Sequence, residues 1–288
     1  MTTDGRSDLG AIEKHDALRQ RIASLGALLV AYSGGVDSTL LAVTARAVLG
    51  ERALPVLAVS DTCPESEVEA ARGVGVALGL GVLEVETYEL TDPTFRANTA
   101  ERCYHCKREL FGLLRAVADT RGLHWVADGS NVDDLGDHRP GMRAAREYGV
   151  VSPLLDVGMS KNDVRALARE LDLPNWDKPS MACLASRFPY GEQITEEGLH
   201  RVARAEDALR ALGLRGFRVR SHGDVARLEV DPSEMELAWG LREHIAKELR
   251  AAGYAFAAQD LEGYRTGSLN ATLSSAERIE SMDGANEA

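Results

Sequence analysis

The sequence is poor in cysteine and has no long hydrophobic run. Four cysteines among 288 residues are too few for a disulfide framework. No apolar stretch reaches the roughly 18 residues that a membrane-spanning helix needs. The first residues are polar and acidic, without the apolar core of a secretory signal or the bias of a transit peptide. These absences predict a cytoplasmic protein with no membrane partner, whose thiols serve metal binding or catalysis.

An excess of positive charge is also missing. The chain has 33 Lys and Arg against 45 Asp and Glu, a net charge of −12, whereas non-specific nucleic-acid binding depends on cations that neutralise phosphates. Residues 201–227 are an exception, because seven arginines stand there against three acidic residues. A small phosphorylated ligand fits this local charge better than a nucleic-acid partner does. A homo-oligomer is compatible with the composition.

Short apolar runs alternate with helical patterns in the first two thirds of the chain. The patterns predict strands at 27–32, 54–59, 82–86 and 125–128, and helices at 8–25, 38–49, 65–78, 109–120 and 160–171. Alternation of this kind is typical of an α/β fold with a doubly wound parallel sheet.

The pattern changes after an irregular segment at 172–195. A helix at 195–212, strands at 217–221 and 225–230, a helix at 233–252 and a strand at 254–259 predict a smaller α+β domain. We therefore expect a first domain over 1–180, a second over 181–268, and a mobile tail over 269–288.

A glycine-rich loop joins the first predicted strand to the following helix. Its residues are Ser33, Gly34, Gly35, Val36, Asp37 and Ser38. Backbone N–H groups at a helix N-terminus bind phosphates, and glycines let the backbone come close to them. The serines add hydroxyl donors, and Asp37 is placed to hold the Mg²⁺ of a nucleotide. The loop lacks the lysine of a Walker A motif, and an ordinary glycine turn is the alternative interpretation.

Two further polar segments follow predicted strands. Asp61 comes after the second strand, and Asp128 and Gly129 come after the fourth. The carboxyl edge of an open parallel sheet is its usual ligand edge. We therefore predict that Asp128 and Gly129, with the following Ser130 and Asn131, contact the nucleotide, and an ordinary turn is the alternative. Asp61 stands where the PP-loop ATP pyrophosphatases, which the glycine-rich loop resembles, place their adenine and ribose contacts.

The cysteines contain one closely spaced pair, Cys103 and Cys106, at a predicted helix start. This spacing is compatible with a redox pair, half of a zinc site, or part of an iron–sulfur site. With Cys183 as a third thiolate, a [4Fe–4S] cluster would keep one iron open for an exchangeable sulfide. A buried apolar role is the alternative for each cysteine, and it is the one that we predict for Cys63.

Several stretches together resemble the LarE family of ATP-dependent sulfur transferases, which help to make the nickel-pincer cofactor of lactate racemase. The matching stretches are AYSGGVDSTLLA, ERCYHCK, HRPGMRAAREYG, NWDKPSMACLASRFPYG and FRVRSHGDVARLEV, spread over about residues 15–265. The first alone resembles the PP-loop ATP pyrophosphatases, which cleave ATP between its α- and β-phosphates. The resemblance implies that ATP adenylates a carboxylate of a pyridinium dicarboxylate mononucleotide, after which a sulfur nucleophile displaces AMP.

The resemblance also implies roles for individual residues. Cys183 falls where the family's sulfur-donating cysteine is expected, and Cys103 and Cys106 favour the cluster-dependent form. Arg187, Arg218 and Arg220 resemble contacts to the substrate phosphate, because a guanidinium fork suits that task. Glu206 and Glu229 resemble the acidic residues of the same pocket. Surface salt bridges are the alternative for all five.

Three other functions share the loop. A PP-loop tRNA thiolase would need a broad basic face, which the net charge does not predict. An ammonia-dependent synthetase has no obvious use for the three cysteines. A non-catalytic nucleotide-binding module would keep the loop without turnover.

Overall fold

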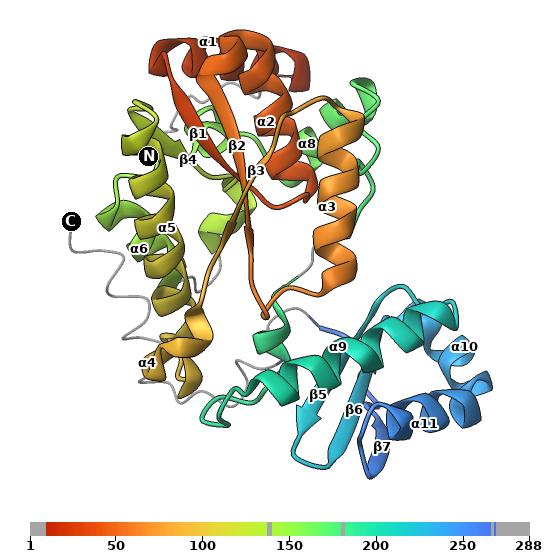
Figure 1. Ribbon diagram of the computed structural model, residues 1–288. Coiled ribbons are helices and arrows are strands. Elements are labelled where there is room, and N and C mark those ends of the chain that lie inside the picture. Colours follow the sequence, from red (N-terminus) through yellow and green to blue (C-terminus); the bar gives the residue numbers. More distant parts are fainter. Residues whose placement is uncertain (1–9, 137–139, 180–181, 266–267, 269–288) are drawn as a thin grey trace, which may run out of the picture. The chain divides into compact units, whose positions relative to one another are not determined.

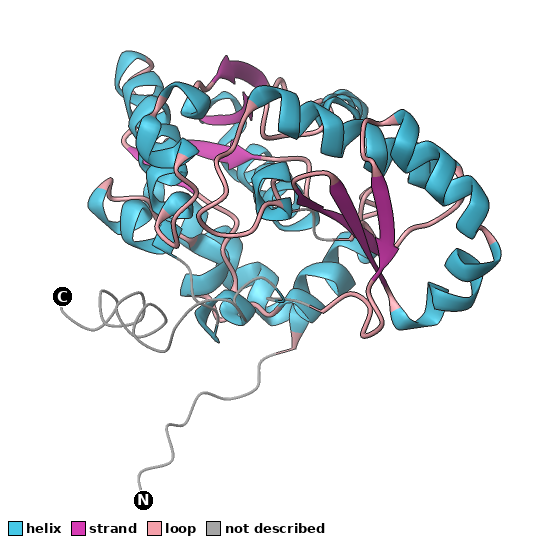
Figure 2. Cartoon of the chain, turned by 90° about the horizontal axis from the view of Figure 1, so that it is seen from below, coloured by secondary structure: helices cyan, strands magenta, loops and turns pink. Residues whose placement is uncertain are grey.

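The computed structural model describes residues 10–136, 140–179, 182–265 and 268. It divides into two compact units, each built around its own sheet; Figure 2 shows the strands in two separate groups. The first unit comprises Met1–Val59, Glu67–Thr87 and Lys107–Met181, and the second Ser60–Ser66, Tyr88–Cys106 and Ala182–Ala288. Among the described residues, no helix combines the length and apolar character that a membrane crossing requires.

A parallel sheet of four strands forms the centre of the first unit (Figure 1). Its order is β3-β2-β1-β4, with β1 at Leu28–Tyr32, β2 at Ala53–Val59, β3 at Leu83–Glu86 and β4 at Trp125–Ala127. Strand β1 pairs with β2 on one side and with β4 on the other. The sequence Leu-Leu-Val-Ala-Tyr of β1 is apolar throughout because helices cover both faces of a parallel sheet.

Helices cover the two faces of this sheet. Helices α2 (Val36–Leu49) and α3 (Glu65–Ala77) lie on one face, and α5 (Arg102–Thr120) lies on the other (Figure 1). Helices α1 (Ala11–Leu25) and α8 (Lys161–Glu170) pack with α2 around one apolar core. The predicted doubly wound fold is confirmed.

Local sequence signals explain several helix ends. Ser160 caps α8, because its hydroxyl accepts a hydrogen bond from the Asp163 N–H. Helix α5 begins at Arg102, seven residues before the predicted helix at 109–120, so Cys103 and Cys106 lie on its first turns. Three short helices were not predicted: α4 (Pro93–Arg96), α6 (Pro140–Glu147) and α7 (Pro153–Asp156).

The second unit contains a sheet of three strands in the order β5-β6-β7. Strands β5 (Phe217–His222) and β6 (Val225–Val230) are antiparallel, and β7 (Phe256–Gln259) is parallel to β6. Its helices are α9 (Glu196–Ala211), α10 (Met235–Gly240) and α11 (Arg242–Ala251). The single helix that was predicted over 233–252 is divided at Leu241, which lies between α10 and α11. The predicted smaller α+β part is therefore present.

The second unit also takes two segments from the N-terminal half of the chain. It resumes at Ala182, next to the predicted boundary, but residues 60–66 and 88–106 also belong to it. Both segments lie within the predicted first domain, 1–180. The predicted tail at 269–288 lies outside the described residues.

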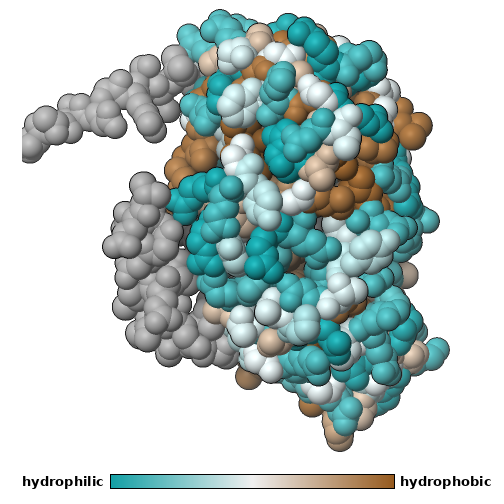
Figure 3. All heavy atoms as spheres, turned by 60° about the vertical axis from the view of Figure 1, so that its left-hand side comes forward, coloured by the Kyte–Doolittle hydropathy of each residue, from teal (hydrophilic) through white to brown (hydrophobic). Residues whose placement is uncertain are grey.

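Hydrophilic side chains cover most of the face drawn in Figure 3, in line with 27% charged residues.

Candidate functional site

The glycine-rich loop of the first unit lies at the end of β1 and opens α2. Gly34 has φ +69° and is buried, and a Cβ at this position would lie 2.5 Å from the Cβ of Ala71. Only glycine fits such a backbone without strain and without a clash. Gly35 is the N-cap of α2 and has no side chain to block the first N–H groups of the helix. The loop therefore leaves a helix N-terminus available to an anion.

Two serine hydroxyls hold the loop together. The Ser38 Oγ accepts a hydrogen bond from the Ser33 N–H at 3.1 Å and donates to the Gly35 carbonyl at 3.1 Å. The hydroxyls of Ser33 and Ser38 are 3.0 Å apart. Ser38 is buried, whereas Ser33 is exposed. Ser38 thus fixes the shape of the loop, and Ser33 faces solvent.

Asp37 pairs with a residue that the sequence analysis missed. Its carboxylate forms an ion pair with the Lys161 Nζ and accepts a hydrogen bond from Asn131 Nδ2 at 3.2 Å. Lys161 is the first residue of α8, so the Ser160 cap fixes its position. The side chains of Lys161 and Asp37 are 23% and 20% exposed, so both reach solvent. A cation and a carboxylate of this kind suit a site that binds phosphates and Mg²⁺.

Two asparagines complete the surroundings of the loop. Asn175 donates from Nδ2 to the Gly34 carbonyl and to Thr39 Oγ1, both at 2.9 Å. It is buried, as is Asn131. Asn131 lies in the polar segment that was predicted after the fourth strand. Asn175 and Lys161 were not predicted, because neither follows a predicted strand and each lies more than 90 residues from the loop in the sequence. A single sequence carries no signal that links residues so far apart.

The residues after β4 lie against the same loop. A Cβ at Gly129 would stand 3.0 Å from the Ser38 nitrogen, so the backbone of Gly129 approaches the start of α2. Asp128 accepts hydrogen bonds from Ser130 Oγ and Ser152 Oγ, each at 2.7 Å, which fix its carboxylate. The structure therefore brings Asp128 and Gly129 next to the glycine-rich loop. Asp61 belongs to the second unit and is exposed.

In the second unit, Arg187 forms a buried ion pair with Glu206. Both guanidinium–carboxylate contacts are 2.8 Å, and the two side chains are 0% and 1% exposed. The Arg187 Nη1 also donates to the carbonyls of Ala182 and Cys183, at 2.7 and 3.1 Å. Arg187 thus holds the Cys183 segment in place, and its burial does not favour the predicted phosphate contact.

The same pair determines the charge of Glu206. Burial would raise the pKa of the Glu206 carboxyl, but the Arg187 guanidinium outweighs it, aided by a hydrogen bond from the Val219 N–H, and the pKa falls below its ordinary value. Glu206 is therefore a carboxylate at neutral pH. Its side chain supports the arginines and is shielded from solvent.

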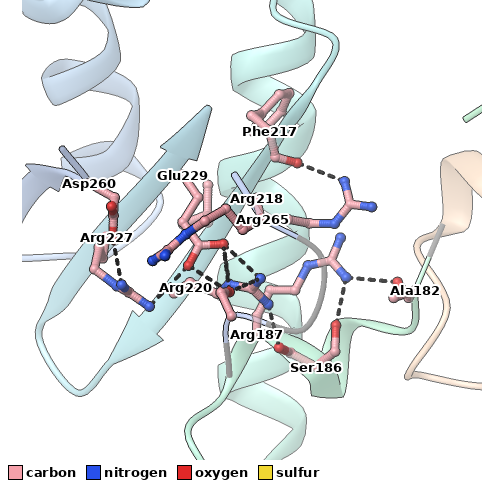
Figure 4. A network of polar contacts seen from close by, with 12 residues as sticks. Ala182, Ser186, Arg187, Phe217, Arg218, Arg220, Arg227, Glu229, Asp260 and Arg265 are labelled. Atoms are coloured by element: carbon pink, nitrogen blue, oxygen red, sulfur yellow. Dashed lines mark hydrogen bonds and ion pairs between the residues drawn. The ribbon is translucent and has the colours of Figure 1, made fainter. Parts of the chain in front are cut away.

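Arg218 and Arg220 lie on β5 and share the face opposite its core residues, as the alternation of a strand predicts. Figure 4 shows Arg220 and Arg227 reaching Glu229 of β6, at 2.7 and 3.1 Å. Burial lowers the pKa of Arg218, and the neighbouring charges of Arg187 and Arg220 lower it further. Tyr264 and Glu206 act in the opposite direction and offset part of this effect. The positive charges of Arg187 and Arg220 near Arg218 favour an anion at this position.

All four cysteines belong to the second unit, and each carries a thiol that is not in a disulfide. Cys106 and Cys183 pack against the same small apolar core around Phe95 and Leu184. Cys103 is exposed. Among the described residues, however, no three Cys, His, Asp or Glu side chains are arranged as a metal site. The prediction for Cys63 was wrong, because its side chain is exposed and not buried.

Arg102 places a buried positive charge beside two of these thiols. It is 4% exposed and donates to Asn98 Oδ1 and, at 3.0 Å, to the Ala185 carbonyl. Burial would lower the pKa of Arg102, but interactions with Cys183 and Cys103 outweigh it and raise the pKa. Arg102 was also missed, because nothing in the sequence distinguishes it from a surface arginine next to a CxxC pair.

Comparisons with known proteins were made for the whole chain. No protein-family model matches it. The pyridinium-3,5-bisthiocarboxylic acid mononucleotide synthase of Lactiplantibacillus plantarum is 35% identical over 265 residues, which cover 92% of this chain and 96% of that protein. An uncharacterized protein of Synechocystis is 43% identical over 90% of this chain and 98% of its own length. One subunit of the glutamine-hydrolyzing GMP synthase of Archaeoglobus fulgidus is 26% identical over 54% of each chain. The first two similarities extend over nearly the whole chain, whereas the third covers about half of it.

Proposed function

Because the chain belongs to the family of the pyridinium-3,5-bisthiocarboxylic acid mononucleotide synthase, we propose that it converts a carboxylate of a pyridinium dicarboxylate mononucleotide into a thiocarboxylate and consumes ATP. The observation that carries the proposal is the loop from Ser33 to Ser38, which opens α2 with exposed donors and a carboxylate paired to a lysine. That loop is suited to hold the phosphates of ATP while the α-phosphorus of ATP reacts.

The first step is adenylation of the substrate. A carboxylate oxygen of the substrate attacks the α-phosphorus of ATP, the bond from this phosphorus to the bridging oxygen breaks, and pyrophosphate leaves. In this step the N–H groups at the start of α2 bind the leaving pyrophosphate. Asp37 holds the Mg²⁺, and Lys161 exchanges its contact with Asp37 for a phosphate oxygen. Lys161 therefore acts as a positioning residue.

The second step delivers sulfur. The thiolate of Cys183 attacks the acyl carbon of the adenylate, a carbon–sulfur bond forms, and AMP leaves with the electron pair. If Cys183 itself supplies the sulfur, removal of its Cα proton breaks its Cβ–S bond and leaves dehydroalanine beside the thiocarboxylate product. The step requires only that the adenylate reach Cys183.

A cluster is the other source of sulfur that the family resemblance implies. Three thiols, of Cys103, Cys106 and Cys183, share one unit, which is the donor set that a [4Fe–4S] cluster with one open iron needs. They are not arranged as a metal site in the described residues. Bound there, the cluster would supply an exchangeable sulfide. Iron and acid-labile sulfide after anaerobic purification would support this form, whereas loss of the elements of hydrogen sulfide from Cys183 would support the sacrificial form.

The arginines of β5 provide the site for the substrate's phosphate. Arg218 is crowded by like charges, and a phosphate dianion would relieve that repulsion. Arg220 is held by Glu229, which keeps its guanidinium in one orientation. We assign the phosphate contact to Arg218 and Arg220, and we assign Glu206 and Glu229 to orienting the arginines.

The proposal is tested by supplying the purified protein with ATP, Mg²⁺ and the pyridinium dicarboxylate mononucleotide. Mass spectrometry of the products should show AMP, pyrophosphate and a product in which sulfur replaces one carboxylate oxygen. One parallel reaction contains bulk tRNA in place of the pyridinium substrate, and another contains ammonium salts together with that substrate. Thiolated tRNA or an amide product, with no thiocarboxylate in the first reaction, would overturn the proposal. Nucleotide binding without pyrophosphate release in any reaction would overturn it as well.

A further inference from the structure

The loop that follows β2 is fixed by a buried carboxylate. Glu89 is 4% exposed, and its Oε1 accepts hydrogen bonds from Ser60 Oγ and Thr62 Oγ1, both at 2.7 Å. Thr62 is itself 3% exposed. The next residue, Cys63, donates from its N–H to the Ser60 carbonyl at 3.0 Å. The backbone that carries Cys63 is therefore held in one conformation.

A backbone hydrogen bond joins this loop to the segment of Cys183. The Thr62 carbonyl accepts from the Leu184 N–H at 2.8 Å. Cys63 directly follows Thr62, and Cys183 directly precedes Leu184, so the two cysteines flank the same hydrogen bond. Both residues belong to the second unit. A disulfide requires Cα atoms within about 7 Å of each other, and this hydrogen bond holds the two cysteine-bearing segments side by side.

The two thiols differ in their access to solvent. Cys63 is exposed, whereas Cys183 is partly buried and packs against the core around Phe95 and Leu184. Arg187 also holds the segment of Cys183, through hydrogen bonds to the Ala182 and Cys183 carbonyls. Both thiols thus sit on fixed backbone, and the exposed one is the first that a reagent in solution meets.

From this juxtaposition we infer that Cys63 and Cys183 form a dithiol site that closes reversibly to a disulfide. A small disulfide such as oxidised glutathione reacts first with the exposed Cys63 thiolate, which gives a mixed disulfide and releases one glutathione thiolate. The Cys183 thiolate then attacks the Sγ of Cys63 and releases the second glutathione. The two cysteines together lose two electrons and two protons, and the glutathione disulfide gains them.

The consequence for activity rests on the proposed function. Closure would occupy the sulfur of Cys183 and stop sulfur delivery, while the loop of the first unit would keep its access to ATP. The oxidised protein should therefore release pyrophosphate but make no thiocarboxylate. A thiol reductant should restore the second step.

Peptide mapping tests the inference without measuring activity. The full-length protein is equilibrated anaerobically, free of iron, in a series of glutathione buffers, and then alkylated, digested and mapped by mass spectrometry without reduction. We expect the peptide that joins Cys63 to Cys183 to exceed any other joined pair by at least about tenfold. The Cys63→Ser variant should give no joined peptide that contains Cys183, and the Cys103→Ser variant should keep the Cys63–Cys183 bond.

Any one of three results would overturn the inferred Cys63–Cys183 dithiol site. The first is a dominant Cys103–Cys106 bond, and the second is glutathione bound separately to Cys63 and Cys183 in the unsubstituted protein. The third is a joined peptide that persists in reductant. Failure of the proposed function gives a different pattern, because the reduced protein would then also lack thiocarboxylate while the Cys63–Cys183 peptide was still found.

Discussion

The Lys161–Asp37 pair beside the glycine-rich loop of the first unit and the Arg187–Glu206 pair of the second unit hold their charges in opposite ways. The side chains of Lys161 and Asp37 keep about a fifth of their surface exposed, whereas those of Arg187 and Glu206 are almost fully buried. An exposed pair is easily exchanged for a ligand, because water and ions compensate its charges. A buried pair cannot be opened without leaving a charge uncompensated. The first pair is therefore suited to binding, and the second to holding structure.

Replacing Asp37 should give the largest effect. In Asp37→Asn the shape of the loop is kept, but the charge that holds Mg²⁺ and attracts Lys161 is lost. Pyrophosphate release should fall by about a thousandfold, the scale of removing a preorganised electrostatic group from an active site. Asp119→Asn is the matched control, because Asp119 is 66% exposed and pairs at the surface with Arg115. Equal rates in the two variants would show that the loop does not serve adenylation.

Breaking the buried pair of Arg187 and Glu206 should lower the stability of the protein before it affects catalysis. Arg187→Met leaves Glu206 buried without its main partner, and the free energy of unfolding should drop by about 3–5 kcal/mol. Arg72→Met removes the pair with Glu84, in which both side chains are 40% exposed, and should cost no more than about 1 kcal/mol. Urea unfolding of the two variants measures both values. Similar losses would mean that burial does not separate the two kinds of pair.

Gly34 and Gly79 separate close packing from backbone conformation. Both have positive φ, but a Cβ at Gly34 would clash with Ala71, whereas nothing lies within 4 Å of a Cβ at Gly79. Gly79→Ala should therefore show the backbone cost alone, about 1 kcal/mol. Gly34→Ala should add about 1–3 kcal/mol for overpacking, and it should also weaken ATP binding because the loop shifts. Thermal unfolding with and without ATP checks this, and equal shifts in both variants would contradict the packing argument.

Acid should weaken the second unit through Glu206. The pKa of this carboxyl is lowered in the folded state, so its contribution to stability is complete above the ordinary glutamate pKa of about 4.3. The contribution is lost as the pH falls below that value toward the folded pKa. The difference in unfolding free energy between the native sequence and Glu206→Gln should therefore be constant from pH 7 to about pH 5 and shrink below about pH 4. A difference that grows on acidification would contradict the assigned direction.

The difference between the two regions also explains which of their features could be predicted from the sequence. The phosphate loop is contiguous, and its glycines, serines and aspartate follow from one strand–turn–helix pattern, so the fold of the first unit and its loop were predictable. Lys161 and Asn175 were not, because each reaches the loop from a distant segment that follows no predicted strand. The strands of the second unit were also found by their alternation.

The roles of the charged residues in the second unit were harder to predict. A sequence shows that Arg187 and Glu206 are present, but not that they face each other away from water. Likewise, Cys63 follows a strand in a segment that the structure assigns to the second unit. Only the three-dimensional arrangement brings its backbone next to that of Cys183.

The central claim is that activation and sulfur delivery are separate tasks of residues in the two units. Cys183→Ser tests it most directly, in a single turnover with ATP, Mg²⁺ and the pyridinium dicarboxylate mononucleotide. The account predicts that this variant releases pyrophosphate and accumulates the acyl adenylate, seen by mass spectrometry, without any thiocarboxylate. Thiocarboxylate formed at the unsubstituted rate, or loss of pyrophosphate release together with the product, would contradict it.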